Sequence, residues 1–534
     1  MRLPSGARRL ALTFTVSAAA AATGLVAAAE LTGDGNRADA TKHARGTGSV
    51  VFLHPDGTGP NHFGAARMYW YGPDAASPWD QLPHAAVYRG HMLDSVTGTS
   101  NGGATTHAFG YKVEAAGSFG RDGDGDAARP VLGLSGHPGS IMREAASAGH
   151  PVGVVNDGNI GEPGTGAFLA EVNNRNDWNE IARQMIEGRS GGDPQPWVIM
   201  GGGERNLLPD DRAGVHCPAG RNTGTDLQRG RTDGRDLIAV AQERGYVVVR
   251  TRAEFETLRA EVNRRPGYAP RVLGVFACHH LFNDRNEEQL RSEGFVDTTV
   301  PAGDRRGDLV LFGQPAPADG DPEDVAARKR SGQNPPTTAE MTALALTILR
   351  RAERAERRHF MLVVEPESND NFANANNAIG TLTALKHAND TIAVVRDHIS
   401  RNPRTLLLTA ADSDAGGMQV LPQRSGEPVG TIPVNPAEGQ PAVQNPLDGI
   451  GGRGTTAFET SPDQFGQTRG FGVAWTGTPD VTGGIVARAQ GVNAQELRTR
   501  YSARFDNVDV YRLMYRTLFG TQLAYPAGRI APAR

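Results

Sequence analysis

The feature that most constrains this chain is a series of short, continuous apolar segments separated by longer stretches with helical character. Each segment has four to six residues, and they are residues 49–54, 151–155, 197–200, 272–277, 360–364, 405–409 and 484–487. Strands buried on both faces carry continuous apolar runs, and parallel neighbours need a crossover connection, usually a helix. The pattern therefore predicts an α/β fold with a mostly parallel central sheet between helices.

One of the intervening helices is especially clear in the sequence. Apolar residues recur at i, i+3, i+4 and i+7 from Met341 to Ile348, and Thr337 and Glu340 have the spacing of a capping box. These signals predict a helix at about 338–358, and a second helix is expected at about 378–400, directly before an apolar segment.

The segment at about 415–467 departs from this alternation. It is rich in Pro, Gly, Gln and Asn and has few apolar runs, which predicts an irregular insertion between two core strands. It could be a flexible loop or a small lid or crown-like subdomain that contacts another subunit.

The N-terminus has the pattern of an export signal. Arg8 and Arg9 precede an acid-free apolar run at 10–22, and alanines at 27–29 offer a cleavage site. The alternative, a membrane anchor, is disfavoured because the run is shorter than the roughly 18 apolar residues that a membrane span needs. The predicted organisation is a signal peptide at 1–29, a linker at 30–47 and a catalytic domain at 48–534. We expect an exported, secreted or extracytoplasmic protein that uses the Sec or the twin-arginine route.

Composition narrows the functional classes. The chain has 55 Lys+Arg against 59 Asp+Glu, and these charges are interspersed, so no basic surface for nucleic acid is expected. Only 2 Cys are present, which excludes thiolate metal clusters and leaves histidine and oxygen ligands for any metal. In an oxidising compartment Cys217 and Cys278 are expected to form a disulfide, with two free thiols as the alternative.

Acidic residues follow several of the predicted strands. They are Asp56, Glu365, Asp370, Asp412 and Asp414, and Asp480 precedes the last apolar segment. Each could serve alone as a helix cap or a turn former. Because ligands gather at the carboxyl ends of strands in open α/β sheets, we expect these side chains to converge. So many carboxylates at one edge would repel one another unless cations lay among them, so the pattern predicts a polynuclear metal site.

From about Val50 to Gly520 the sequence resembles the alkaline phosphatase family. Asp56 opens a segment, residues 56–59, that is similar to the family's metal-binding Asp-Gly turn, and residues 99–112 resemble its nucleophile helix. Counting back from Gly110 makes Ser100 the phosphorylated serine, whereas alignment from the preceding Val96 makes Thr99 the nucleophile. This register remains open.

The resemblance also implies a set of metal and substrate ligands. Asp56, Glu162, Thr165 and Glu365 would hold Mg²⁺, and Arg175 would grip the phosphate with its planar guanidinium. The paired metal sites would be built from Asp370, Asn374, Asp412 and Asp480.

At these paired sites the sequence departs from the family, because the expected histidines are replaced by Asp or Asn. His107, His279 and His280 lie off the ligand positions and are expected to be structural or surface residues. Oxygen-only sites favour hard cations, so Mg²⁺, Ca²⁺, Mn²⁺ or Zn²⁺ could fill the paired sites, but we expect that they do not both hold zinc.

The resemblance implies an exported, metal-dependent phosphate monoester hydrolase that acts through a phosphoserine. Alternatives are phosphodiester or sulfate ester hydrolysis on the same fold, or a non-catalytic relative that binds phosphate or cations. The expected partners are small phosphate esters and a second copy of the chain in a homodimer, and no membrane span is expected.

Overall fold

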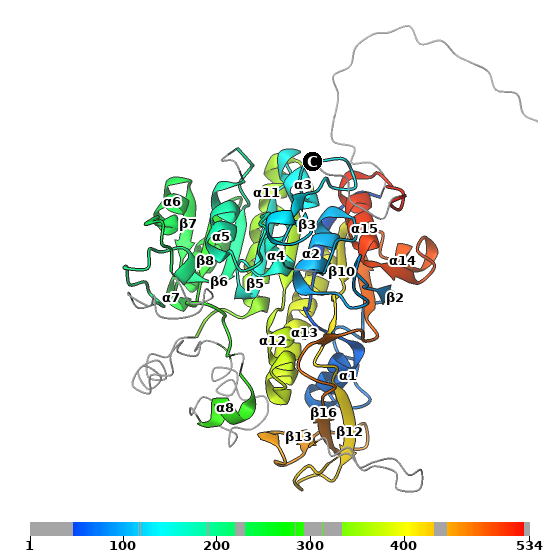
Figure 1. Ribbon diagram of the computed structural model, residues 1–534. Coiled ribbons are helices and arrows are strands. Elements are labelled where there is room, and N and C mark those ends of the chain that lie inside the picture. The colour runs from blue at the N-terminus through cyan, green and yellow to red at the C-terminus, as the bar shows by residue number, and fades with distance from the viewer. Residues whose placement is uncertain are drawn as a thin grey trace, which may run out of the picture. The chain divides into compact units, whose positions relative to one another are not determined.

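The computed structural model describes residues 46–527 apart from 116, 118, 190–191, 218, 220–229, 284, 293–311, 313–333 and 432–445. The predicted signal peptide and all but the end of the predicted linker lie outside the described residues. The described chain is built around one large mixed sheet with helices on both faces (Figure 1).

The sheet has ten strands in the order β19-β2-β18-β10-β1-β9-β5-β6-β8-β7. The strands are β1 Ser49–Leu53, β2 His84–Arg89, β5 Val152–Asn159, β6 Val198–Gly202, β7 Tyr246–Val249, β8 Arg271–Val275, β9 Met361–Glu365, β10 Thr405–Thr409, β18 Val486–Gly491 and β19 Arg504–Asp506. From β10 to β7 every neighbouring pair is parallel, and only β18 runs antiparallel to its neighbours. The predicted α/β fold with a mostly parallel sheet is confirmed.

The helices cover the sheet in two layers. They are α1 Pro60–Trp70, α2 Ser100–Phe109, α3 Ile141–Ser147, α4 Pro163–Gly166, α5 Trp178–Glu187, α6 Leu237–Glu243, α7 Arg252–Arg264, α8 Glu287–Ser292, α11 Thr338–Glu356, α12 Ser368–Asn374, α13 Ala378–Arg401, α14 Glu496–Thr499 and α15 Asn507–Phe519. Successive side chains of a strand point to opposite faces. Accordingly, Val50 and Phe52 pack in one apolar cluster with α2 and α15, while Val51 and Leu53 pack in the other with α11 and α13.

The sequence analysis missed three strands towards the two ends of the sheet, which are β19 and β2 at one end and β7 at the other. In β2 buried and exposed residues alternate, and Val87 is 65% exposed. In β7 the two middle residues are only half-buried. Both strands are thus only partly buried. The alternation explains why β2 was missed, but β7 carries the continuous apolar run Tyr-Val-Val-Val and was overlooked despite it.

The predicted insertion at about 415–467 contributes four strands to a small separate sheet, and the fifth strand, β16, lies just beyond it. Strands β12 Gln419–Gln423, β13 Asp448–Gly449, β14 Gly452–Arg453, β15 Phe458–Glu459 and β16 Gly470–Ala474 pair antiparallel. Most of them are only two residues long, which explains why a Pro- and Gly-rich sequence reads as irregular.

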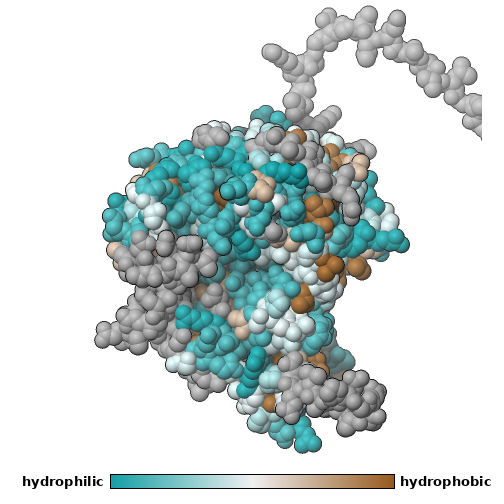
Figure 2. Space-filling model, in the orientation of Figure 1, coloured by the Kyte–Doolittle hydropathy of each residue, from teal (hydrophilic) through white to brown (hydrophobic). Residues whose placement is uncertain are grey.

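Cys217 and Cys278 form a disulfide, as predicted. In the described part of the chain, no helix is both long enough and apolar enough to cross a membrane. The face shown in Figure 2 is mostly hydrophilic.

Candidate functional site

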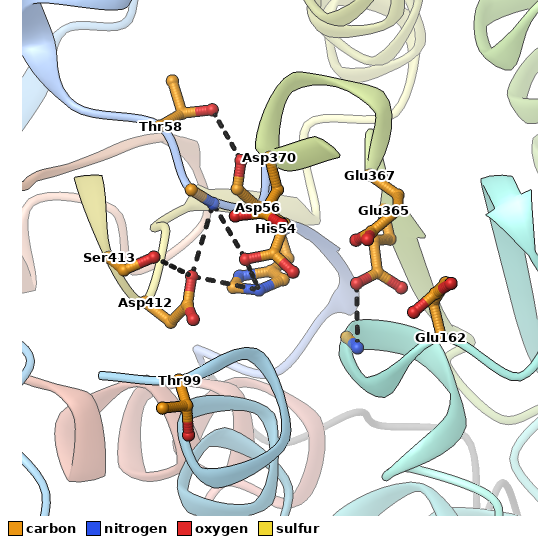
Figure 3. Close-up of polar contacts among 12 residues, drawn as sticks. His54, Asp56, Thr58, Thr99, Glu162, Glu365, Glu367, Asp370, Asp412 and Ser413 are labelled. Carbon is orange, nitrogen blue, oxygen red and sulfur yellow. Dashed lines mark hydrogen bonds and ion pairs between the residues drawn. The ribbon is translucent and has the colours of Figure 1, made fainter. Parts of the chain in front are cut away.

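Three adjacent strands at the centre of the sheet, β10, β1 and β9, end at one cluster of polar side chains (Figure 3). Asp56 follows β1, Glu365 is the last residue of β9, and Asp412 lies three residues beyond β10. All three are buried. The convergence expected from the strand-end rule is therefore observed.

Asp56 lies at the centre of this cluster. Its Oδ1 accepts a hydrogen bond of 2.8 Å from Gly57 N, and the same amide lies 3.4 Å from Asp412 Oδ1. Gly57 has φ +59°, and a Cβ there would lie 2.5 Å from Asp370 Oδ1. Only glycine therefore allows the backbone turn to approach these carboxylates so closely.

One group of carboxylates lies on the β9 side. Ligand oxygens of Asp56, Glu365 and Glu367 lie within 4.8 Å of one another. Glu365 is held by the amides of Gly164 and Thr165 at the start of α4, each 2.8 Å away, and by the Thr165 hydroxyl at 3.1 Å.

Glu162 belongs to the same region and caps α4. Its Oε1 lies 2.7 Å from His280 Nε2, so His280 is a buried partner of a predicted ligand. Thr165 positions Glu365, and its hydroxyl also accepts a hydrogen bond from Asn156. The four predicted Mg²⁺ ligands are thus close together.

Glu367 was missed by the sequence reasoning. It lies two residues beyond β9, is 3% exposed, and its Oε2 has no hydrogen-bond partner among the described residues. The signal that could have found it is a second acid in the segment Glu365-Pro366-Glu367.

A second group of predicted ligands lies beside Asp56 on α12 and β17 Asp480–Val481. Asn374 Nδ2 is 3.0 Å from each Asp370 carboxylate oxygen and 3.3 Å from Asp480 Oδ1. Asp370, Asn374 and Asp480 are therefore brought together as expected.

Of the two acids after β10, Asp412 faces the cluster and Asp414 does not share its contacts. Asp414 lies in β11 Asp414–Ala415, which pairs with β17, and its Oδ1 is 3.3 Å from His62 Nδ1. Of these two acids, the structure places Asp412 with Asp56 and His54.

His54, which the sequence analysis did not single out, also lies in the cluster. This residue directly follows β1 and is completely buried, and its Nε2 lies 3.6 Å from Asp56 Oδ1 and 3.9 Å from Asp412 Oδ1. Sequence reasoning read it as the end of an apolar strand. Its position two residues before Asp56 was the available signal.

The other histidines have structural contacts. His107 Nε2 lies 2.7 Å from the Tyr88 hydroxyl, and the ring of His279 packs edge-on against Trp178. These two agree with the structural role expected for them.

The cluster concentrates several buried carboxyl groups whose pKa values are raised, as expected where cations would neutralise them. Burial raises the pKa of Glu365 to about 8, with repulsion from Asp56 adding to the effect. Burial and repulsion by neighbouring carboxylates also raise the pKa values of Glu367, Asp370 and Asp412 well above their ordinary range. Divalent cations would remove this repulsion.

Unpartnered atoms support the same conclusion. Asp56 Oδ2, Asp412 Oδ2, Glu367 Oε2 and Asn374 Oδ1 are buried and have no hydrogen-bond partner among the described residues. Buried polar atoms are normally satisfied, and carboxylate and amide oxygens are the ligands that hard cations prefer. The residues present therefore fit bound divalent metals.

Helix α2 begins at this cluster. Its N-cap is Thr99 and its first residue is Ser100, which is 5% exposed. A Cβ at Gly103 would lie 2.5 Å from Asp412 Cβ, so the first turn of the helix packs directly against the metal-binding side chains.

The two candidate nucleophiles have different surroundings. The Thr99 hydroxyl donates to Ala115 O at 2.8 Å and accepts from Gly102 N at 3.3 Å, and it points away from Asp412 in Figure 3. Arg175 reaches the same helix, with one guanidinium nitrogen 3.4 Å from Asn101 Oδ1. Arg175 thus contacts the residue that directly follows Ser100 in the first turn of α2.

A pocket of about 250 Å³ opens beside Asp412. Its lining includes Arg89, His91, Thr97, Ser413 and Thr482. It lies between the end of β2 and the loop that leads into α2.

Comparisons with known proteins agree with this geometry. The family model for alkaline phosphatase matches residues 48–454. Streptomycin-6-phosphate phosphatase of Streptomyces griseus is 27% identical over 397 residues, which cover 70% of this chain and 75% of that protein.

Solved structures show the same fold. The alkaline phosphatase from the Antarctic bacterium TAB5 has a TM-score of 0.56 at 15% identity, covering 89% of this chain and 100% of that chain. Thermus thermophilus alkaline phosphatase has a TM-score of 0.55 at 19% identity, covering 90% of this chain and 94% of that chain. Because the family model spans well over half of the sequence, the chain belongs to the alkaline phosphatase family and is a metal-binding phosphatase.

Proposed function

We propose that the protein hydrolyses phosphate monoesters through a phosphoserine at Ser100. The observation that carries this proposal is the position of Ser100 as the first residue of α2, a helix that packs against Asp412 at Gly103 and is contacted by Arg175 at Asn101. These contacts would bring a nucleophile, a phosphate-binding cation and metal ligands to one place.

Ser100 is favoured over Thr99 because the Thr99 hydroxyl is already committed. Thr99 donates its proton to a main-chain carbonyl and caps the helix, which is the ordinary role of an N-cap threonine. A nucleophile must instead present a free oxygen to the phosphorus.

The phosphate would be held by the N-terminus of α2 and by Arg175. The backbone N–H groups and the helix dipole favour an anion at that end of a ten-residue helix. The guanidinium of Arg175 could give up its long contact with Asn101 and bind two phosphate oxygens at once.

Metals would be held in three places around Asp56. We propose Mg²⁺ beside Glu162, Thr165 and Glu365, with Glu367 as an additional ligand, and a pair of cations at Asp412 and at the Asp370-Asn374-Asp480 group. Bound there, divalent cations supply charge neutralisation for the attacking and leaving oxygens. The carboxylates keep the pair in place, and Gly57 allows Asp56 to be shared among the sites.

The preference for monoesters is supported by the Streptomyces griseus relative, whose name describes the removal of one phosphate from streptomycin 6-phosphate. The pocket beside Asp412 offers a place for the leaving group, with Arg89 and His91 in its wall. The guanidinium of Arg89 would suit a leaving group that carries additional negative charge.

We further propose that the protein is exported and acts as a homodimer. The disulfide between Cys217 and Cys278 supports an oxidising compartment, in agreement with the signal-like pattern at residues 1–29. Secretion of a fusion to this segment and sedimentation of the purified protein test the two proposals.

The nucleophile is tested with p-nitrophenyl phosphate as substrate and Mg²⁺, Ca²⁺, Mn²⁺ or Zn²⁺ as the added cation. Ser100→Ala should lower kcat by at least about 10³-fold, because loss of a nucleophile removes the covalent route, whereas Thr99→Ser should retain most of the activity. Acid quenching followed by peptide mass spectrometry should find phosphate on Ser100.

Three outcomes would contradict the proposal. Full activity of Ser100→Ala together with loss in Thr99→Ala would assign the nucleophile to Thr99. Faster hydrolysis of bis(p-nitrophenyl) phosphate than of the monoester would identify a diesterase. Phosphate binding without turnover under every cation would identify a non-catalytic relative.

A further inference from the structure

His54 occupies a fixed position at the end of β1. Its Nδ1 lies 2.8 Å from Ala410 O, and the two residues lie just beyond the paired residues Leu53 and Thr409 of β1 and β10. A carbonyl oxygen can only accept, so Nδ1 carries the hydrogen and donates it. In the neutral ring, this leaves Nε2 as the atom with a lone pair.

Nε2 points into the carboxylate cluster. It lies 3.6 Å from Asp56 Oδ1 and 3.9 Å from Asp412 Oδ1, and it has no hydrogen-bond partner among the described residues. Both separations exceed a hydrogen bond. They are close to the ~3.3 Å that separates ligand atoms around one tetrahedral ion with bonds of ~2.0 Å.

Packing prevents the ring from turning away. The His54 ring contacts Phe52 at a centroid distance of 5.7 Å and His107 at 5.3 Å, and the side chain is 0% exposed. A rigid ligand with one ring nitrogen hydrogen-bonded to a backbone carbonyl is the usual arrangement of a metal-binding histidine.

His62, eight residues later, provides a contrast within the same loop. Gly59 N donates to its Nδ1 at 3.1 Å, and its Nε2 lies 3.1 Å from Ala415 O. Both nitrogens are therefore used by the backbone. Burial lowers the pKa of His62 to about 4, so the ring is neutral and its 3.3 Å approach to Asp414 is not an ion pair.

We propose that His54 Nε2 is a direct ligand of the cation held between Asp56 and Asp412. The site between Asp56 and Asp412 then offers one nitrogen and two carboxylates. Such a site favours borderline cations such as Zn²⁺ and Co²⁺ over Mg²⁺. The Asp370-Asn374-Asp480 group keeps oxygen ligands only. The inference rests on the proposed function only for the presence of a cation between Asp56 and Asp412.

The competing role for His54 is that of a cationic counter-ion. Burial opposes the charged imidazole, but the neighbouring carboxylates raise its pKa to about 10. In the metal-free protein a proton would thus occupy the position that a cation takes in the loaded protein. The two roles make opposite predictions when metal is added.

The test uses the full-length protein, freed of metal with a chelator and titrated with Co²⁺. If Nε2 binds the ion, the hydrogen on Nδ1 is protected by Ala410 and should give a paramagnetically shifted, solvent-exchangeable proton NMR line, coupled to nitrogen in protein labelled with ¹⁵N-histidine. This measurement needs no variant. The absence of any such histidine line at full Co²⁺ occupancy would overturn the proposal.

Two variants test whether the shifted NMR line comes from His54. His54→Gln should abolish it and weaken Co²⁺ binding at this pocket by at least about 100-fold, since loss of even an indirect metal contact costs 10- to 100-fold. His62→Gln, the matched control, should keep both the line and the affinity. Persistence of the line and unchanged affinity in His54→Gln would instead make His54 a counter-ion.

Failure of this inference is separable from failure of the proposed function. Turnover with a Co²⁺ spectrum that lacks a histidine line would leave the phosphatase proposal intact and refute the ligand. A histidine line in a protein without turnover would establish the ligand alone.

Discussion

The two groups beside Asp56 that we propose as cation sites differ in chemistry and in accessibility. His54 and Asp412, with Asp56, come from the ends of adjacent central strands and are at most 2% exposed. Asp370, Asn374 and Asp480 come from a short helix and a two-residue strand, and Asn374 and Asp480 are only half-buried. The first group offers a fixed nitrogen and the second a set of more accessible oxygens. Sites that share a carboxylate can therefore still select different metals.

The largest effect on activity is expected from a substitution that affects more than one group of ligands at once. Asp56→Asn removes the carboxylate shared by the His54-Asp412 and Glu365-Glu367 groups. Activity should fall by about 10³-fold or more, because metal stabilisation of several kcal/mol corresponds to several powers of ten. Elemental analysis should show reduced occupancy of more than one metal. Loss of a single metal would show that Asp56 is not shared.

A narrower change separates the two groups. Asp480→Asn removes one charge from the oxygen-only group, 3.3 Å from Asn374 Nδ2. Mn²⁺ binding there should weaken by about 10- to 100-fold, while the Co²⁺-dependent histidine line of His54 stays unchanged. Competition with a metal indicator dye measures the affinity. An equal effect on both sites would mean that they load as one unit.

The oxygen-only group can also be made to resemble its neighbour. Asn374→His adds an imidazole on α12, four residues beyond Asp370, where the two side chains already meet. Zn²⁺ binding should tighten by about tenfold, because imidazole suits Zn²⁺ better than an amide oxygen does. Asn374→Gln, which keeps the amide, is the control. No gain in Zn²⁺ affinity would indicate that geometry rather than ligand type limits this site.

The smallest effect concerns stability against pH in the absence of metals. Glu365 has a pKa of about 8 in the folded protein and 4.5 as its ordinary value, so the folded chain binds more protons between these values and loses stability as pH rises. His54, raised from 6.5 to about 10, acts in the same direction at higher pH. With a chelator present, Tm should fall by a few degrees from about pH 5 to about pH 9. Excess Mg²⁺ and Zn²⁺ should flatten this slope, and a rising Tm would contradict the pKa shifts.

Much of the fold followed from apolar patterning. The run at 405–409 coincides with β10, and the helix expected from Thr337 begins at Thr338 behind its capping box. Strand β2, which lies between β19 and β18, was missed because its buried and exposed residues alternate as in a surface segment. A continuous apolar run indicates a strand that is buried on both faces. The pattern is weaker in strands that are only partly buried.

The sequence likewise predicted some residues of the candidate site and missed others. Asp56, Glu365 and Asp412 were found because they follow buried strands, and parallel strands deliver their carboxyl ends to one edge. His54 and Glu367 were missed because their sequence neighbours do not reveal which atom faces the cluster. His54 ends an apolar run and resembles a core residue.

The sequence by itself determined the order of strands along the chain, the supply of acids at their ends and the Asp-Gly turn that only glycine permits. The tertiary structure decided which strands became neighbours, which of Asp412 and Asp414 faces Asp56, and which nitrogen of His54 is free. Those choices depend on contacts between residues hundreds of positions apart, such as the hydrogen bond from His54 to Ala410. A hydrogen bond of that kind fixes a tautomer, and the tautomer determines which atom remains to bind a metal.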